Sequence, residues 1–215
     1  MSTSLRITEI FHSLQGESNT VGLPTVFVRL TGCPLRCQYC DTAYAFSGGL
    51  MYEQEQVLKE VASYAADYVT VTGGEPLAQQ ACWPLLTALC DAGYSVSLET
   101  SGAIDIALVD KRVIKVMDLK TPASAEMNKN LLANIALLSA QDQVKFVICD
   151  REDYIWSKQK VQEYDLQDKV ADVLFSPSKD QLDAKELAEW ILSDKLKVRF
   201  QIQLHKYIWG DGPGH

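Results

Sequence analysis

Short runs of β-branched and other apolar residues alternate along the chain with longer stretches in which apolar residues recur every three or four positions. The first pattern predicts buried strands and the second predicts amphipathic helices. We expect helices at residues 53–64 and 81–91 and around the apolar stripe of residues 187–191. We expect strands at residues 25–30, 68–72, 94–99, 113–118, 143–149, 170–175 and 197–203.

This alternation also predicts the fold class. Strands that alternate with helices favour βα units and a mostly parallel sheet. A complete eight-fold βα barrel takes about 250 residues, whereas this chain has 215. The stretch between residues 99 and 113 also leaves little room for a helix. We therefore expect an α/β fold in a single domain over residues 1–215, arranged as a partial, reduced βα barrel.

Composition and charge narrow the range of functions. The chain is 47% hydrophobic and 22% charged, as in soluble globular proteins, and no apolar run approaches the roughly 20 residues that span a bilayer. Residues 1–6 lack the basic and apolar segments of a leader peptide, so we expect no membrane association and a cytoplasmic location. The net charge is −8 and the basic residues are scattered, which excludes a nucleic-acid partner and favours a small-molecule substrate.

Three of the six cysteines lie in one short loop directly after an expected strand. Cys33, Cys37 and Cys40 are separated by three and then two residues, so their thiolates can bind one metal centre. A [4Fe-4S] cluster usually takes four cysteines. Three would leave one iron open to a small chelating ligand, as catalytic metal sites keep one position open. A zinc site completed by a distant histidine or cysteine is the alternative. We interpret the other cysteines as apolar core residues: Cys82, Cys90 and Cys149.

The CxxxCxxC spacing resembles that of the radical S-adenosylmethionine superfamily. Residues 71–76, VTGGEP, are similar to the GGEP segment of that superfamily, which contacts the methionine amino group of the cofactor. The glycines let a ligand approach the backbone closely, and Glu75 can accept a hydrogen bond from an ammonium group. Residues 97–102, 116–122 and 176–179 also end expected strands in polar groups. These ends either contact the cofactor or are ordinary strand-to-helix turns.

Further segments resemble one family within that superfamily, 7-carboxy-7-deazaguanine synthase, which acts in the pathway to queuosine and other 7-deazapurines. They are FHSLQGE at 11–17, FVRL at 27–30, CDT at 40–42 and HKY at 205–207. The resemblance implies a lyase that converts 6-carboxy-5,6,7,8-tetrahydropterin to 7-carboxy-7-deazaguanine with loss of ammonia. A 5′-deoxyadenosyl radical would take a hydrogen from C6 of the substrate before the ring contracts. It also implies a [4Fe-4S] cluster, regenerated S-adenosylmethionine, Mg²⁺, an electron donor of the flavodoxin or ferredoxin type, and a homodimer.

The resemblance assigns roles by position. The cluster would be held by Cys33, Cys37 and Cys40, and Mg²⁺ by Thr42. The substrate would contact Leu14, Gln15, Gly16, Arg29 and Thr72. S-adenosylmethionine would contact Tyr39, Cys40, Asp41, Gly74, Glu75, Asp118, Leu119, Lys120 and Ser176. No side chain is assigned as a catalytic group, because the bound cofactor carries out the radical chemistry.

Alternatives remain open for several of these residues. Arg29 could instead form a salt bridge within a barrel strand, and Thr42 could be a helix N-cap. His205 and Lys206 either face the pocket or close the sheet. Another possible function is an activase that makes a glycyl radical on a partner protein, which would not need the set of Gln15, Arg29 and Thr42. A further one is a non-catalytic electron carrier or zinc-binding module.

The chain departs from the family in two places. Some members end at a residue whose terminal carboxylate helps to bind the substrate, whereas this chain runs on through residues 209–215. Where relatives have Ser-Pro-Lys after a middle strand, this chain has Asp-Leu-Lys at 118–120, so only Lys120 matches.

Overall fold

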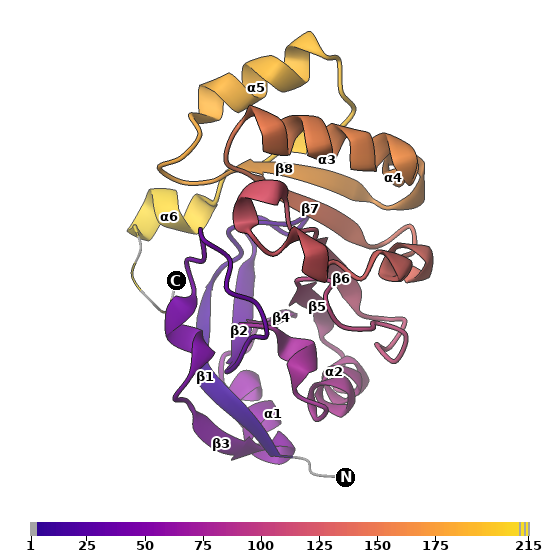
Figure 1. The fold of residues 1–215 in the computed structure, drawn as a ribbon. Helices are drawn as coiled ribbons and strands as arrows, with labels where there is room; N and C mark the ends of the chain where they lie inside the picture. The colour runs from indigo at the N-terminus through magenta and orange to yellow at the C-terminus, as the bar shows by residue number, and fades with distance from the viewer. Residues whose placement is uncertain (1–3, 211, 213, 215) are drawn as a thin grey trace.

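One curved sheet organises the chain. The computed structural model describes residues 4–210, 212 and 214, and its strands lie in the order β3-β1-β2-β4-β5-β6-β7-β8-β9 (Figure 1). From β2 onward neighbouring strands are parallel, whereas β1 pairs antiparallel with both β2 and β3. The strands are β1 (Ser4–Leu14), β2 (Pro24–Leu30), β3 (Leu50–Glu53), β4 (Tyr68–Gly73), β5 (Ser95–Thr100), β6 (Ile114–Asp118), β7 (Gln143–Ile148), β8 (Asp172–Pro177) and β9 (Arg199–Phe200).

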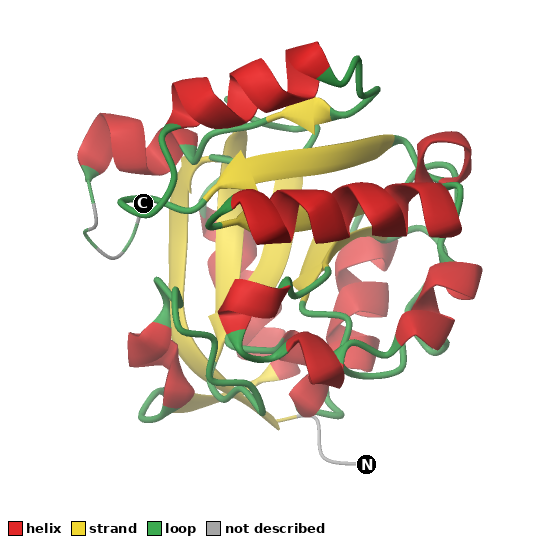
Figure 2. Ribbon diagram, turned by 45° about the horizontal axis from the view of Figure 1, so that its top comes forward, coloured by secondary structure: helices red, strands yellow, loops and turns green. Residues whose placement is uncertain are grey.

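The larger helices pack on the outer face of this curved sheet, as Figure 1 and Figure 2 show. They lie in the connections between parallel strands, and right-handed crossovers put successive helices on the same side of a sheet. The helices are α1 (Gln54–Ser63), α2 (Cys82–Asp91), α3 (Arg151–Glu163), α4 (Leu166–Lys169), α5 (Ala184–Ser193) and α6 (Leu204–Trp209). Short 3₁₀ turns lie between them: η1 (Ala43–Phe46), η2 (Pro76–Ala78), η3 (Pro122–Ser124), η4 (Met127–Lys129) and η5 (Leu132–Leu137).

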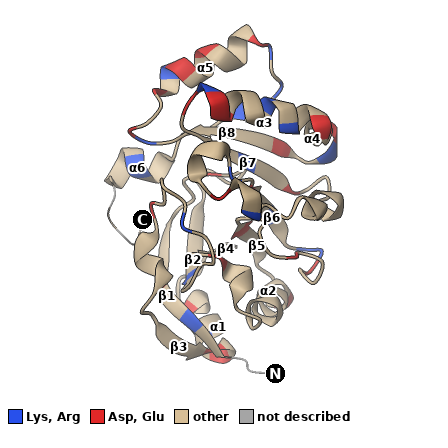
Figure 3. Ribbon diagram, in the orientation of Figure 1, with Lys and Arg blue, Asp and Glu red and all other residues tan. Residues whose placement is uncertain are grey.

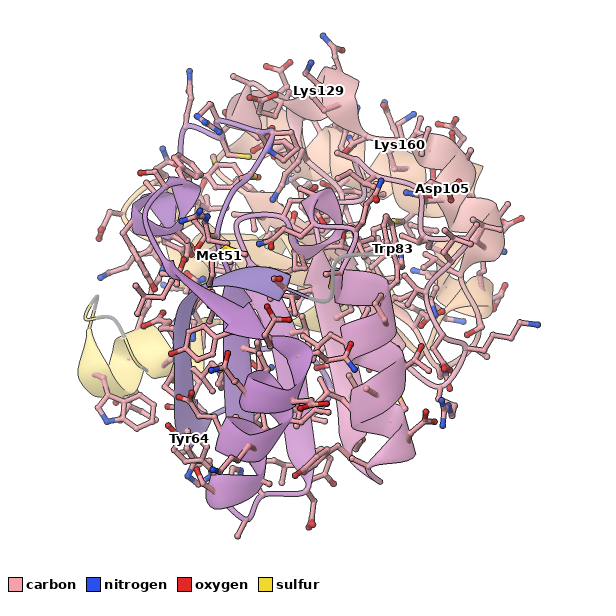
Figure 4. The ribbon with its side chains drawn as sticks, turned by 90° about the horizontal axis from the view of Figure 1, so that it is seen from below. Met51, Tyr64, Trp83, Asp105, Lys129 and Lys160 are labelled. Atoms are coloured by element: carbon pink, nitrogen blue, oxygen red, sulfur yellow. The ribbon has the colours of Figure 1, made fainter. Side chains whose placement is uncertain are left out.

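The hydrophobic core lies between the sheet and these helices. In β4, Val69 and Val71 are fully buried in the core, and the alternate residues Thr70 and Thr72 point to the opposite, concave face. Helices α1 and α2 supply the matching apolar stripes and lie side by side in the view of Figure 4. The concave face is therefore free to carry polar side chains.

The sheet does not close into a barrel. One edge is β3, where Leu50 and Met51 (labelled in Figure 4) are 70% and 56% exposed. The other edge is β9, and beyond it α6 reaches back to the start of the chain, where the Leu204 N–H donates to the Gly16 carbonyl at 3.0 Å. The expected partial βα barrel with a mostly parallel sheet is confirmed.

The sequence patterns predicted the central elements better than the edges. Strands β2 and β4 to β8 and helices α1, α2 and α5 are confirmed within a few residues. The expected strand at 197–203 was wrong in extent, because only Arg199–Phe200 pairs and the chain then turns into α6. Strands β1 and β3 and helices α3, α4 and α6 were not predicted. In β1 a register shift between Ile7 and Glu9 breaks the alternation of apolar residues that marks a strand.

The charged residues of the outer helices are of mixed sign. Acidic and basic residues are interspersed along α3, α4 and α5 in Figure 3, without a segregated basic surface there. Among the described residues, no helix combines the length and apolar character needed to cross a bilayer. The interpretations of residues 1–3 as lacking a leader, and of the tail at positions 211, 213 and 215, lie outside the described residues.

Candidate active site

A cavity of about 620 Å³ opens on the concave face, at the carboxyl ends of the parallel strands. That volume falls in the range of small-molecule sites, roughly 300–1,000 Å³. Ligands bind at this end of βα folds because the loops after the strands converge there. Most of the residues assigned from the sequence line it: Leu14, Gln15, Gly16, Arg29, Cys33, Cys37, Tyr39, Cys40, Asp41, Thr42, Thr72, Gly74, Asp118 and Lys120.

The cysteine loop is held in place by its own backbone and by a neighbouring loop. The Gly32 N–H donates to the Ala45 carbonyl at 2.8 Å, and the Cys40 N–H donates to the Cys37 carbonyl at 3.2 Å. The Arg36 N–H donates to Glu126 at 2.6 Å, and its guanidinium donates to the Cys33 carbonyl at 2.7 Å. Of the three thiols, Cys33 also accepts from the Leu35 N–H at 3.4 Å, and all three face the cavity.

Lys120 supplies positive charge to this loop. Burial raises the pKa of the Cys37 thiol to about 11, and the Lys120 ammonium opposes that shift. Lys120 also acts against the raised pKa values of Cys33 and Cys40. Burial lowers the pKa of Lys120, but Asp118 and Cys37 raise it by more. The pKa of Lys120 therefore lies above its ordinary value, and the side chain stays charged. A cation at this place favours the thiolates that a metal centre requires.

The two glycines after β4 bring the next loop against the cysteine loop. The Gly74 N–H donates to the Leu30 carbonyl at 3.2 Å, and the Glu75 N–H donates to the Gly32 carbonyl at 2.9 Å. A Cβ at Gly74 would collide with the Gly32 carbonyl and with Cys33. The missing side chain is what lets this backbone border both the cysteines and the cavity.

The Glu75 carboxylate holds this turn from beneath and does not line the cavity. It is fully buried and accepts from the Leu77 N–H at 3.1 Å, the Thr100 hydroxyl at 2.9 Å and the Ser101 N–H at 2.7 Å, and also from the Ser101 hydroxyl. The role assigned to its side chain, accepting from an ammonium ligand, therefore does not fit this placement. Within the described residues, its donors come from the turn itself and from the end of β5.

Next to the cysteines, two buried polar atoms in the cavity wall lack a protein partner among the described residues. They are the Tyr39 hydroxyl and Oδ1 of Asp118. The other carboxylate oxygen of Asp118 lies 3.1 Å from the Lys120 ammonium. Buried polar atoms are rarely left unpaired. An acceptor and a hydroxyl in this position fit the ribose and amino acid groups of a nucleoside cofactor.

On the other side of the cavity, the residues assigned to the substrate form a connected wall. The Gln15 side chain donates to the Thr70 hydroxyl at 3.1 Å, and the Thr72 hydroxyl donates to Glu99 at 2.9 Å. The Arg29 Nε donates to Glu9 at 2.7 Å. The alternative of a salt bridge for Arg29 is therefore correct, but Arg29 also lines the cavity, and the described residues accept no hydrogen bond from its other N–H groups.

Thr42 precedes η1, but its hydroxyl does not cap that turn. It donates instead to Asp41 at 2.8 Å. Asp41 lies 2.7 Å from the Lys206 ammonium and accepts from Gln203 at 3.1 Å. Burial works to raise the pKa of Asp41, but Lys206 and these hydrogen bonds lower it well below its ordinary value. A hydroxyl and a carboxylate at the cavity wall are hard oxygen donors of the kind Mg²⁺ prefers.

Besides Glu75, two assigned residues lie away from the cavity, and others that were not assigned line it. Leu119 is fully buried in the core, and Ser176 is buried within β8, whereas Ser178 and Lys179 after that strand reach the cavity. His205 and Lys206 both face it. Glu17 and Lys145 also line it and were not assigned a role. Glu17 closes the FHSLQGE segment, whose assigned residues were Leu14, Gln15 and Gly16, and Lys145 lies in no motif. Glu99 was mentioned only as part of a polar strand end.

The spacing of the thiols bears on the choice between zinc and a cluster. No group of three or more His, Cys, Asp or Glu side chains within the described part of the chain converges as a single metal ion requires. Zinc draws sulfur ligands to about 2.3 Å, whereas a four-iron cluster binds each cysteine at a different iron. The three thiols share the wall of one cavity, where a cluster would have each of them as a ligand.

This combination of a partial βα barrel with three cysteines and a glycine turn at one cavity defines a radical S-adenosylmethionine protein. The model of the radical SAM superfamily matches residues 27–120. QueE from Escherichia coli has the same fold, with a TM-score of 0.78 and 23% identity over 94% of this chain and 95% of that one.

Sequence relatives narrow the class further. The chain is 42% identical to 7-carboxy-7-deazaguanine synthase of Koribacter versatilis, over 95% of this chain and 97% of the relative. It is 43% identical to the protein of the same name from Chlorobaculum tepidum, over 97% of each. The chain belongs to the 7-carboxy-7-deazaguanine synthase family. Its cofactors are a [4Fe-4S] cluster, S-adenosylmethionine and Mg²⁺, as predicted from the cysteine spacing and the family resemblance.

Proposed function

We propose that this cavity is the site at which the chain converts 6-carboxy-5,6,7,8-tetrahydropterin to 7-carboxy-7-deazaguanine and ammonia in 7-deazapurine biosynthesis. The observation that carries the proposal is that the cysteine loop, the Gly74 turn and the wall of Gln15, Arg29 and Thr72 all border one cavity. An activase for a partner protein would require an opening for a polypeptide, not this set of polar groups around a small cavity.

Cys33, Cys37 and Cys40 would hold the cluster, and the fourth iron would remain open to S-adenosylmethionine. When bound, these cofactors supply a carbon radical that takes a hydrogen from C6 of the substrate. The two orphaned atoms, the Tyr39 hydroxyl and Oδ1 of Asp118, support a role in binding the cofactor. The Lys120 ammonium interacts electrostatically with the Cys37 and Cys40 thiols, so it would balance the negative charge of the cluster.

Thr42 would bind Mg²⁺ through its hydroxyl, with substrate carboxylate and water completing the shell, because Mg²⁺ usually keeps several waters. Asp41 holds that hydroxyl at 2.8 Å and fixes its orientation. Arg29, whose guanidinium lies over the Tyr44 ring in the turn that follows Thr42, adds positive charge to the same cavity, where an anionic substrate needs it. Burial keeps water away from the reacting carbon.

The backbone of Leu14, Gln15 and Gly16 would read the polar edge of the pterin. The Gln15 side chain is 2% exposed and already bonded to Thr70. Its contribution is therefore to fix the loop. The Gln15 N–H and carbonyl are themselves bonded to Leu23 and Gly22, and the Gly16 carbonyl accepts from Leu204, so the Gly16 N–H is the backbone donor that the loop would offer to the ligand. Thr72, bonded to Glu99, holds the neighbouring strand end in the same way.

Reduction of the cluster requires one electron from outside, and we propose a flavodoxin- or ferredoxin-type protein as its source. We also propose that the chain acts as a homodimer in the cytoplasm. The absence of a membrane-spanning helix among the described residues agrees with that location. Analytical ultracentrifugation tests the dimer, and a single species of about one chain mass would overturn it.

The deciding experiment is an anaerobic assay with reductant, carboxylated pterin and S-adenosylmethionine. Wild-type protein should release one ammonia for each deazaguanine formed. Cys37→Ala should lose all turnover and the iron–sulfur absorption, whereas Cys90→Ala, a half-buried cysteine outside the cavity, should keep both. Unchanged pterin in the wild-type assay would refute the substrate, and a colourless, zinc-containing protein would refute the whole class.

A further inference from the structure

One buried ion pair in the cavity has no part in the roles assigned above. Lys145 on β7 and Glu17 in the loop after β1 lie with Nζ and Oε1 2.6 Å apart, and their side chains are only 11% and 12% exposed. Both residues line the cavity. Removing two charges from water costs more than their attraction commonly returns. An ion pair that is retained at a ligand site despite this cost in desolvation free energy indicates a functional role there.

A second buried pair in the same sheet shows how a purely structural one is built. Lys115 and Asp142 lie 3.1 Å apart with side chains 7% and 0% exposed. The Lys115 ammonium also donates to the Val113 carbonyl, and the Asp142 carboxylate accepts from the Lys115 N–H and from Ser139. This pair lies outside the cavity wall and its hydrogen-bonding capacity is used by the protein.

Lys145 differs from Lys115 in that respect. An ammonium group has three N–H donors, and in the described part of the chain Glu17 is the acceptor that lies within reach of Lys145. Lys145 and Asp118 are register partners on adjacent parallel strands, and both face the cavity. The remaining N–H bonds of the ammonium are therefore available to a ligand in the cavity.

The charged groups around Lys145 keep it protonated. It is faced by Glu17 from the loop after β1, Glu99 from β5, Asp118 from β6 and His205 from α6. Burial alone would lower the pKa of Lys145, but the three carboxylates raise it above its ordinary value. The group in the cavity is thus an ammonium ion at neutral pH, with protons to give.

The proposed reaction needs such a donor, and the following inference rests on that proposed function. A carbon–nitrogen bond must break, and nitrogen leaves readily only when a proton neutralises it. We propose that Lys145, held in position by Glu17, donates the proton to the nitrogen that departs as ammonia.

In this step an Nζ–H bond of Lys145 breaks as a new N–H bond forms on the departing amino group. The C–N bond breaks, and its electron pair leaves with the nitrogen. The adjacent ring carbon gives its proton to the Glu99 carboxylate, and the electrons of that C–H bond become the new double bond of the five-membered ring. Return of the proton from Glu99 to Lys145 restores both groups, so no oxidant or reductant is consumed.

The test separates the radical step from the loss of ammonia. The holoenzyme is given pterin deuterated at C6, and two rates are measured: deuterium entering S-adenosylmethionine and ammonia released. With Lys145→Met, ammonia release should fall about 100-fold or more. Deuterium transfer should remain within about threefold of wild type, because hydrogen abstraction does not use this proton. A ring-contracted species with the mass of the substrate should accumulate.

Two further variants exclude a merely structural role. Lys145→Arg keeps a positive charge beside Glu17 but replaces the compact ammonium with a planar, rigid guanidinium that cannot present an N–H at the same point, so it should show the same separation of the two rates. Lys111→Met, which removes an exposed lysine far from the cavity wall, should leave both rates unchanged. Restoration of ammonia release by arginine, or an equal fall in both rates with Lys145→Met, would overturn the proposal. If wild-type enzyme showed neither rate, the proposed substrate itself would be wrong.

Discussion

Replacement of Glu75 by glutamine tests whether the glycine turn is held from beneath by a saturated carboxylate. Both oxygens of Glu75 accept hydrogen bonds, from the N–H groups of Leu77 and Ser101 and from the hydroxyls of Thr100 and Ser101. The amide of glutamine keeps one acceptor oxygen and turns the other into a donor, which faces donors. About two buried donors then lose their partner, at roughly 1–3 kcal/mol each. The hydroxyls can turn away, so we expect Glu75→Gln to cost about 2–4 kcal/mol of folding free energy.

Thermal unfolding of the cluster-free protein measures this cost without any ligand. A chain of this size shifts its Tm by about 2–4 °C for each kcal/mol, so Glu75→Gln should unfold about 4–16 °C lower than wild type. Urea unfolding gives the free energy independently, provided that the slope stays the same.

Glu99→Gln is the matched control, with the opposite expected sign. Burial raises the pKa of Glu99, and the nearby Glu17 adds to the shift. The folded protein therefore binds this proton more readily than the unfolded chain, so the carboxylate costs stability at pH values above its folded pKa. Glu99→Gln should raise the Tm at pH 8, and the gain should vanish as the pH falls toward the ordinary pKa of about 4.3. A normal Tm for Glu75→Gln combined with weaker binding of S-adenosylmethionine would refute this reasoning, because it would show that Glu75 faces the ligand.

Two other expectations follow from the packing around the cavity. Gly74→Ala should destabilise the protein by about 1–3 kcal/mol, as overpacking does, because its Cβ would overlap the cysteine loop. Iron uptake after reconstitution should fall as well, and normal uptake would contradict the expectation. Lys206→Met should cost about 0.5–1 kcal/mol and increase hydrogen exchange in α6, because the ion pair with Asp41 is only partly exposed. The exposed pair of Lys185 and Glu189 is its control, and Lys185→Met should change neither quantity measurably.

The centre of the fold was predictable because its signals are local. A run such as Tyr68–Gly73 holds four consecutive β-branched residues, Val69 to Thr72, all of them buried, as is typical of a central parallel strand. The cysteine loop was predictable for the same reason, because its three ligands lie within one short segment. The family resemblance added the substrate wall, and the structure brings those residues to one cavity.

What could not be predicted depends on contacts between distant segments. Glu17 and Lys145 meet only because the sheet brings β7 beside the loop that follows β1. The placement of the Glu75 carboxylate beneath the turn could not be predicted, because nothing in the local sequence indicates the donors that Thr100 and Ser101 supply. The start of α6 could not be predicted, because the strand before it, Arg199–Phe200, is too short to show where the strand ends and the helix begins.

The wall of the cavity joins the two ends of the chain, since the Leu204 N–H donates to the Gly16 carbonyl and His205 packs where a side chain at Gly16 would lie. During synthesis the three thiols leave the ribosome long before residue 204 does, because chains emerge from their N-terminus. The three cysteines can therefore bind metal while the cavity beside them still lacks the part of its wall that α6 supplies. The wall of the cavity is therefore complete only after residues 204 and 205 have been synthesised. A polypeptide stalled before that point would carry the iron-binding loop without the wall that confines a reactive species.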